Sequence, residues 1–293
     1  MALLHQVVSL AFHVHRPKLT RNVSIQSNNN VNDQGYSRWK QAPFDFSSKQ
    51  GWEEFYKNGQ ITSPSREDDD NSSLEYEWHS HIPHSAIIDT IAPSIEAAAN
   101  SSSNYGELPS ILIVGCGNSS LPRVLHDAFD YPVRITCLDY SKVCIDMIRQ
   151  MYSESCPRMD FVVGDAMKLR EVISEHNTLN SGEEYHYDVV IDKGLMDALM
   201  CGEGFDVGNL QREVEKVLTC HPWGMHILIC FPLITGTKDI LNELGQENYG
   251  LNLFWRFDLP VEGCENGRAS FNVGKRGLWK LDVEVVASET NWN

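Results

Sequence analysis

The sequence predicts an α/β fold built on a seven-stranded, mostly parallel sheet, with an antiparallel last strand and helices on both faces. From Ser110 onward, short apolar runs alternate with segments of helical periodicity, which is typical of parallel strands joined by crossover helices. No convincing helix separates the last two runs, so we expect those strands to pair antiparallel at one end of the sheet. The predicted strands are Ile111–Cys116, Arg134–Asp139, Met159–Asp165, Asp188–Asp192, Met225–Phe231, Leu251–Leu259 and Leu278–Ala287.

Three segments place apolar residues at the spacing of one helix face: Ser85–Ala99, Ser141–Met151 and Leu210–Leu218. We interpret these stripes as core positions, because apolar stripes at helical spacing usually pack against a sheet. Pro93 lies inside the first segment and is expected to kink it.

The chain divides into three predicted parts: residues 1–48 as a disordered leader, 49–104 as an N-terminal flap and helix, and 105–290 as the main domain. Residues 1 to 32 contain Arg16 and Arg21 but no Asp or Glu, and their start is amphipathic. That combination is typical of organellar transit peptides. A disordered tail explains it equally well, so a mitochondrial or other organellar location and a cytoplasmic location both stay open.

Composition narrows the class of partner. The chain is 42% hydrophobic and 22% charged, with a net charge of −16. No window approaches the ~18 uninterrupted apolar residues of a membrane span, so we expect no membrane association. An acidic body repels phosphate backbones, which disfavours nucleic acid and favours a cationic substrate. We expect the protein to act as a monomer.

Metal binding is disfavoured by the spacing of the residues that commonly ligate metals. The eight cysteines are scattered without the close pairing of a zinc site, so we interpret them as reduced thiols. His79, His81 and His84 lie in a proline-containing loop without a matching set of acids or thiols.

The strongest functional signal is an apolar run that leads into a glycine-rich turn, with Gly115, Gly117 and Ser119 following Ile111–Val114. Glycine is needed there because a Cβ would keep the backbone away from a nucleoside or its attached chain. Asp139 ends the next predicted strand, where a carboxylate can accept hydrogen bonds from ribose hydroxyls.

Two further strand ends extend this pattern. The third predicted strand ends at Gly164-Asp165-Ala166, where a carboxylate can accept from an adenine amino group, and the fourth ends at Asp192. Ligands of open α/β sheets lie at the carboxyl ends of the strands. The sequence therefore predicts one nucleoside bound along this edge of a Rossmann-like sheet.

A dinucleotide-dependent dehydrogenase begins with a similar strand and turn. Here Ser120 occupies the third glycine position, so the full fingerprint is broken, and no second nucleotide half is visible. We therefore disfavour that class.

Five segments resemble the seven-strand methyltransferases that modify elongation factor 1-alpha and mitochondrial citrate synthase on lysine. Two lie in the sheet region, Val114–Leu121 and Asp188–Leu199, and a third is the Asp139-Tyr140-Ser141 turn. The front of the chain adds Trp52–Tyr56 followed by Tyr76-Glu77-Trp78.

The resemblance covers roughly residues 50 to 235. The chain departs from the group in a long acidic insert between Tyr56 and Tyr76 and in its final third, Phe231–Asn293. The final third carries substrate choice in such enzymes.

The resemblance implies an S-adenosylmethionine-dependent methyltransferase that N-methylates a lysine of a protein substrate. Gly115, Gly117 and Ser119 would surround the methionine end of the cofactor. Asp139 and Tyr140 would bind its ribose.

The resemblance also implies the roles of the remaining site residues. Asp165 and Ala166 would bind the adenine, and Asp192 would face the reacting centre as the catalytic residue. Trp52 and Tyr56 would form a front flap over the pocket, with Trp52 in contact with the cofactor. No metal is implied.

Other interpretations of these residues stay open. Trp52, Tyr56 and Trp78 also suit a packing role, and Lys193 can neutralise the neighbouring Asp192. Asp188 and Asp197 suit structural roles. For the whole protein, methylation of a small molecule and a non-catalytic S-adenosylmethionine-binding scaffold are the alternatives.

Overall fold

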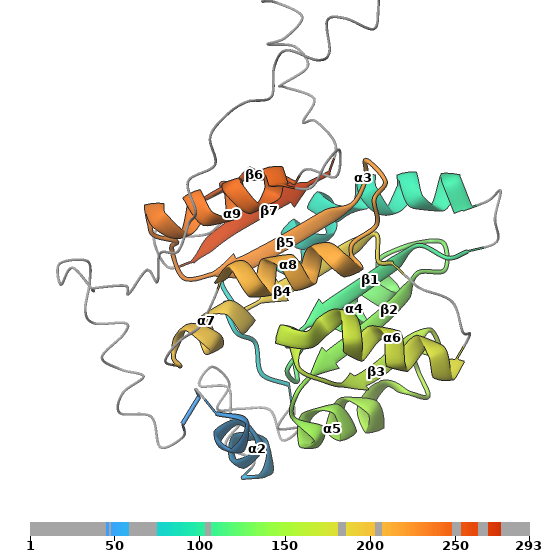
Figure 1. The fold of residues 1–293 in the computed structure, drawn as a ribbon. Helices are drawn as coiled ribbons and strands as arrows, with labels where there is room; N and C mark the ends of the chain where they lie inside the picture. The colour runs from blue at the N-terminus through green and yellow to red at the C-terminus, as the bar shows by residue number, and fades with distance from the viewer. Residues whose placement is uncertain are drawn as a thin grey trace, which may run out of the picture. The chain divides into compact units, whose positions relative to one another are not determined.

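The fold is known from a computed structural model of the chain (Figure 1). It describes residues 45–46, 48–58, 75–102, 107–180, 186–202, 207–247, 253–262 and 269–276. The predicted leader, residues 1–48, lies almost wholly outside the described residues, and so does the acidic insert that follows Tyr56.

Seven strands form one sheet in the order β3-β2-β1-β4-β5-β7-β6. Strand β7 pairs antiparallel with both β5 and β6, whereas the other pairs are parallel. This arrangement confirms the predicted seven-stranded, mostly parallel sheet with an antiparallel last strand. The strands are β1 (Ser110–Val114), β2 (Arg134–Asp139), β3 (Met159–Val163), β4 (Val189–Lys193), β5 (Met225–Cys230), β6 (Phe254–Arg256) and β7 (Ser270–Lys275).

The three helices predicted from periodicity are present, with ends that differ from the prediction by a few residues. They are α3, α5 and α8, and Pro93 lies within α3. The helices of the described residues are α2 (Lys49–Lys57), α3 (His84–Ser102), α4 (Leu121–Asp127), α5 (Lys142–Tyr152), α6 (Leu169–Asn180), α7 (Leu195–Met200), α8 (Val207–Val217) and α9 (Thr235–Glu247), with a 3-10 helix η1 (Ala166–Lys168).

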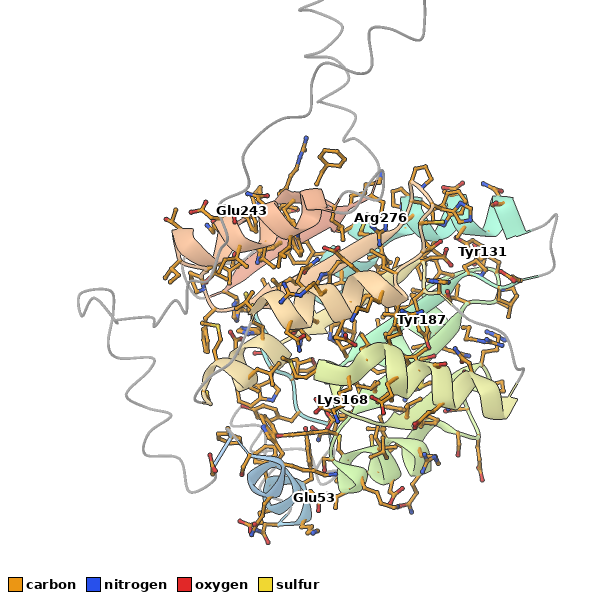
Figure 2. The ribbon with its side chains drawn as sticks, viewed as in Figure 1. Glu53, Tyr131, Lys168, Tyr187, Glu243 and Arg276 are labelled. Atoms are coloured by element: carbon orange, nitrogen blue, oxygen red, sulfur yellow. The ribbon has the colours of Figure 1, made fainter. Side chains whose placement is uncertain are left out.

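Helices cover both faces of the sheet, as predicted, and alternate residues of each buried strand point to opposite faces. Ile111 and Ile113 of β1 pack in the core that also contains apolar residues of α3, α4 and α5. Leu112 and Val114 pack in the core that contains residues of α6, α8 and α9. Tyr187, labelled in Figure 2, is almost fully buried on the second face, where its hydroxyl donates to Oγ1 of Thr136 (3.1 Å).

The predicted strands in the final third were partly wrong. The sixth strand is only Phe254–Arg256, because the chain turns at Asp258, which has a left-handed φ of 52°. The seventh strand is Ser270–Lys275, a segment that we did not predict. The predicted strand Leu278–Ala287 lies outside the described residues.

The first and third strands end earlier than predicted, at Val114 and Val163, because the chain turns before the residues of the candidate site. Within the described parts of the chain, no helix combines the length and the apolar character that a bilayer span requires.

Candidate functional site

The glycine turn follows β1 at the carboxyl edge of the sheet. Gly115 and Gly117 have φ values of 60° and 55°, a left-handed conformation that favours glycine. A Cβ on Gly115 would lie 2.8 Å from Cβ of Leu195, and one on Gly117 would lie 3.3 Å from the hydroxyl of Tyr56. Both positions therefore favour glycine by their conformation, and Gly115 favours it for space as well.

Asp139 ends β2 beside this turn and is 5% exposed. The backbone N–H of Gly117 donates to its Oδ2 (3.1 Å), and that of Ser141 donates to its Oδ1 (2.9 Å). Burial raises the pKa of Asp139 to about 6, although both hydrogen bonds act to lower it. The structure thus joins the predicted ribose ligand directly to the glycine turn.

Asp192 lies on the other side of β1, where the register pairs it with Val114. Its Oδ1 accepts from the backbone N–H groups of Leu195 (2.9 Å) and Met196 (3.3 Å). Its Oδ2 is buried and has no hydrogen-bond partner among the described residues. Burial, with a smaller contribution from Asp197, raises the pKa of Asp192 to about 8.

Lys193 does not neutralise Asp192. Its Nζ donates to Oε2 of Glu77 (2.7 Å) and to the backbone carbonyl of Trp78. Successive residues of a strand point to opposite faces, so Lys193 and Asp192 diverge although they are adjacent in sequence.

Glu77 is the residue of this region that sequence reasoning missed. Its Oε1 accepts from the hydroxyl of Ser119 (2.7 Å) and from both the N–H (2.7 Å) and the hydroxyl (2.9 Å) of Ser120. Burial opposes ionisation, but hydrogen bonds from His84 and Lys193 outweigh it and hold the pKa of Glu77 well below its usual range. The Tyr-Glu-Trp element at residues 76–78 was its only signal in the sequence.

The residues predicted to bind adenine lie at the end of β3. Asp165 is exposed and caps η1, because its Oδ1 accepts from the N–H of Met167 (2.9 Å). Ala166 is buried. Tyr140 follows Asp139 and is half-buried, and burial raises the pKa of its phenol, with Asp139 adding to the effect.

Trp52 and Tyr56 lie on α2, within a cluster of aromatic rings that includes Trp78. The centroid of the Trp52 ring lies 5.9 Å from that of Tyr56 and 5.8 Å from that of Trp78. Nε1 of Trp52 donates to the backbone carbonyl of Phe46 (2.9 Å), and the residue is 8% exposed. These contacts favour packing for Trp52, and its contact with a cofactor stays a prediction.

Asp197 and the histidines of the preceding loop have separate partners. Nε2 of His79 lies 2.6 Å from Oδ2 of Asp197, and both side chains are buried. Oδ1 of Asp197 accepts from the N–H of Phe231 (2.8 Å), which fits the structural role that we expected. His84 pairs instead with Glu77 (3.3 Å).

Asp188 also has structural partners. Its Oδ2 accepts from the backbone N–H of Ser110 (2.9 Å), and its Oδ1 accepts from the indole of Trp223 (2.7 Å). The residue therefore joins the start of β4 to the start of β1, far from the carboxyl edge.

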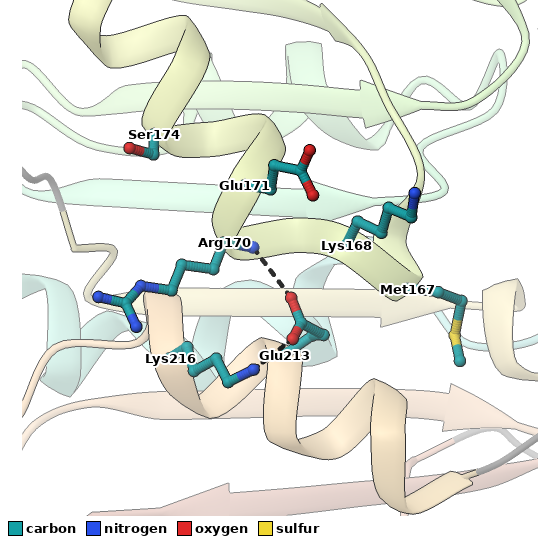
Figure 3. Close-up of a pocket in the computed structure, with 7 residues that line it drawn as sticks. All are labelled: Met167, Lys168, Arg170, Glu171, Ser174, Glu213 and Lys216. Carbon is teal, nitrogen blue, oxygen red and sulfur yellow. Dashed lines mark hydrogen bonds and ion pairs between the residues drawn. The ribbon is translucent and has the colours of Figure 1, made fainter.

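A surface pocket lies between η1, α6 and α8 and contains none of the predicted site residues (Figure 3). Figure 3 shows Glu213 between Arg170 and Lys216: it accepts from the backbone N–H of Arg170 (3.1 Å) and pairs with the ammonium of Lys216. This pocket has mixed charge, and neither Asp139 nor Asp192 lines it.

Curated relatives confirm the resemblance that the sequence indicated. The chain is 32% identical over 114 residues to an eEF1A lysine and N-terminal methyltransferase of Xenopus laevis, covering 38% of this chain and 15% of the relative. It is 28% identical over 145 residues to a mitochondrial citrate synthase-lysine N-methyltransferase of Danio rerio, covering 49% of this chain and 54% of the relative. The chain thus spans about half of one relative and a small part of the other. No family model matches it.

Solved structures similar to the chain include human methyltransferase-like protein 13 in complex with SAH, at 18% identity and a TM-score of 0.44 over 70% of this chain and 88% of that one. A SAM-dependent methyltransferase from Aquifex aeolicus has 11% identity and a TM-score of 0.46 over 76% of this chain and 97% of that one.

Proposed function

We propose that the protein is an S-adenosylmethionine-dependent methyltransferase that N-methylates a lysine side chain of a protein substrate. The observation that carries the proposal is the buried, unpartnered Oδ2 of Asp192, one strand away from a glycine turn that is joined to Asp139. The names of the curated relatives support both the reaction and the class of substrate.

The residues at the carboxyl edge suit the cofactor. The turn at Gly115 and Gly117 would admit the methionine end, because neither glycine carries a Cβ. Asp139 and Tyr140 would bind the ribose, and Asp165 with Ala166 would bind the adenine. Each Asp139 oxygen accepts one hydrogen bond from the backbone, and a carboxylate oxygen can accept a second.

Bound S-adenosylmethionine supplies an electrophilic methyl group on a sulfonium sulfur. The task of the protein is then mainly to hold an amine in line with that group. A free lysine has a pKa near ~10.4, so the amine must lose its proton on or before entry. Removal of the ammonium from water assists that loss.

Asp192 would orient the acceptor. Its Oδ1 is fixed by two N–H groups at the start of α7, so Oδ2 has a defined direction. An unpaired buried carboxylate oxygen is costly, and a lysine ammonium or amine would satisfy it. Asp197 adds negative charge nearby, as its effect on the pKa of Asp192 shows.

A protein substrate also fits the net charge of −16, which favours a basic partner surface over nucleic acid.

Two measurements test this function. Calorimetry with S-adenosylmethionine should show binding, and radiolabelled methyl transfer into cytosolic and organellar lysates should label a protein band in one of them. The labelled residue is then identified by peptide mass spectrometry. A labelled soluble metabolite would assign a small-molecule methyltransferase, and binding without transfer would assign a scaffold. Absence of binding would reject the function altogether.

A further inference from the structure

We propose that Glu77 is a positioning residue for the cofactor, which holds the segment after the glycine turn against the end of β4. This inference rests on the proposed function. Glu77 lies in the front segment of the chain. It is far in sequence from the segment after the glycine turn, which its Oε1 contacts, and from β4, which its Oε2 contacts.

One oxygen of Glu77 organises the segment that follows Gly117. Ser120 precedes α4 and its side chain makes no capping hydrogen bond. The backbone N–H of Ser120 donates instead to Oε1 of Glu77 (2.7 Å), and the hydroxyls of Ser119 and Ser120 donate to the same atom. A single carboxylate oxygen thus fixes the direction in which the chain leaves the turn.

The other oxygen of Glu77 is tied to β4. Nζ of Lys193 donates to Oε2 (2.7 Å), and Nε2 of His84 lies 3.3 Å from the same atom. The Lys193 side chain is only 5% exposed, so this is a largely buried ion pair. The backbone adds a third link, because the N–H of Tyr76 donates to the carbonyl of Asn118 (3.3 Å).

These contacts change the role of Ser119. Its hydroxyl donates to Glu77 and accepts from the N–H of Leu121 (3.0 Å). The single hydrogen of the Ser119 hydroxyl is therefore donated to Glu77 and is not available to a cofactor. Ser119 acts on the turn through Glu77, and a cofactor would meet the backbone of Gly115 and Gly117.

The test compares Glu77→Gln with Glu75→Gln in the full chain. Glu75 is a matched control, because it lies on the same segment but accepts from the hydroxyl of Tyr152 (2.6 Å) at the end of α5. We expect Glu77→Gln to raise the Kd and KM for S-adenosylmethionine about 10- to 100-fold, while kcat changes less than about threefold. Glu75→Gln should stay within about twofold of the parent.

Stability is separated from positioning by adding Lys193→Met to Glu77→Gln. The single variant leaves the Lys193 ammonium buried without its carboxylate, so its Tm should fall. The double variant removes that charge, so its Tm should recover. Positioning predicts that the cofactor affinity stays weak in the double variant. Recovery of affinity together with Tm would show that Glu77 is merely structural and would overturn the proposal.

Other outcomes are equally decisive. Equal cofactor affinity in the parent and Glu77→Gln, or equal losses in Glu77→Gln and Glu75→Gln, would reject the positioning role and leave the methyltransferase assignment intact. A parent that does not bind S-adenosylmethionine would reject both. If Glu77→Gln does not fold, Ser120→Ala removes one donor to Oε1 and keeps the ion pair. It should weaken binding about three- to tenfold, and parental affinity would reject the proposal.

Discussion

Asp139 at the end of β2 and Asp192 at the end of β4 are both buried, and each accepts two backbone hydrogen bonds. They differ in how these hydrogen bonds are distributed between the two oxygens of each carboxyl group. Asp139 receives one on each oxygen, whereas Asp192 receives both on Oδ1 and none on Oδ2 among the described residues. Burial raises the pKa of Asp139 to about 6 and that of Asp192 to about 8.

The difference separates a carboxyl group with both oxygens hydrogen-bonded from one with an unpartnered oxygen. The carboxylate of Asp139 shapes the turn before any ligand arrives, so its hydrogen bonds contribute to the fold. The free oxygen of Asp192 costs the fold free energy and is satisfied only when a donor enters. A buried ionisable group with a strongly shifted pKa is typical of functional sites, even though it lowers the stability of the fold.

The largest expected effect is that of Asp192→Asn on methyl transfer. The amide keeps the shape but cannot ionise when a lysine ammonium enters, so it lacks the charge that would orient the acceptor, and kcat should fall about 100- to 1000-fold. Cofactor affinity, measured by calorimetry, should change less than about threefold. A variant with parental kcat would show that Asp192 is not the acceptor-orienting residue.

The same variant should be more stable than the parent at high pH. The pKa of Asp192 is raised to about 8 in the fold, above its value near ~3.9 in the unfolded chain. The parent therefore loses stability as pH rises from about 4 to 8, because only the unfolded chain releases this proton readily. Thermal unfolding should show a higher Tm for Asp192→Asn at pH 9 and a smaller difference at pH 5.

Asp139→Ala should weaken cofactor binding about 10- to 100-fold, since it removes the proposed ribose ligand and the acceptor that fixes Gly117. With saturating cofactor, kcat should recover most of the parental value, in contrast to Asp192→Asn. Equilibrium dialysis with labelled S-adenosylmethionine gives the affinity. Parental affinity in a folded variant would remove Asp139 from the site.

The smallest effect is expected at His226, whose two ring nitrogens are buried and have no hydrogen-bond partner among the described residues. Burial lowers the pKa of His226 to about 3, so the unfolded chain binds a proton between about pH 3 and 6.5 that the fold excludes. His226→Leu should raise the free energy of unfolding by about 2 kcal/mol more at pH 5 than at pH 8. Urea denaturation at both pH values measures the free energy of unfolding. An equal gain at the two pH values would contradict the lowered pKa of His226.

The part of the fold from β1 to β5 could be predicted from the sequence because each strand is mostly apolar and lies next to a segment of helical periodicity or a turn signal. Strand β7 could not, because its buried residues include Ser270, Asn272 and Gly274. Asn272 is satisfied by the carbonyl of Leu228 (3.1 Å), and Gly274 leaves room for Trp255, which a Cβ would approach to 2.9 Å. Both reasons depend on contacts with strands distant in sequence.

The candidate site shows the same division between residues that a local pattern predicts and residues that depend on contacts distant in sequence. The places of Gly115, Gly117 and Asp139 at the edge of the sheet could be predicted because they follow from a local strand and turn. Glu77 could not, because Ser119, Ser120 and Lys193, which give it its place at the site, lie 42 to 116 residues further along the chain. Asp192 was found by its position, but its unpaired oxygen became visible only once the surrounding backbone was placed.

The position of β7 has a consequence for synthesis of the protein. Strand β7 lies between β5 and β6 but follows both in the chain. While the ribosome has released only the residues before Ser270, β5 has no neighbour on its outer side, and β6 has no strand to join. The nascent chain therefore exposes an unpaired strand edge of the kind that promotes aggregation, and the sheet closes in a late step after β7 emerges.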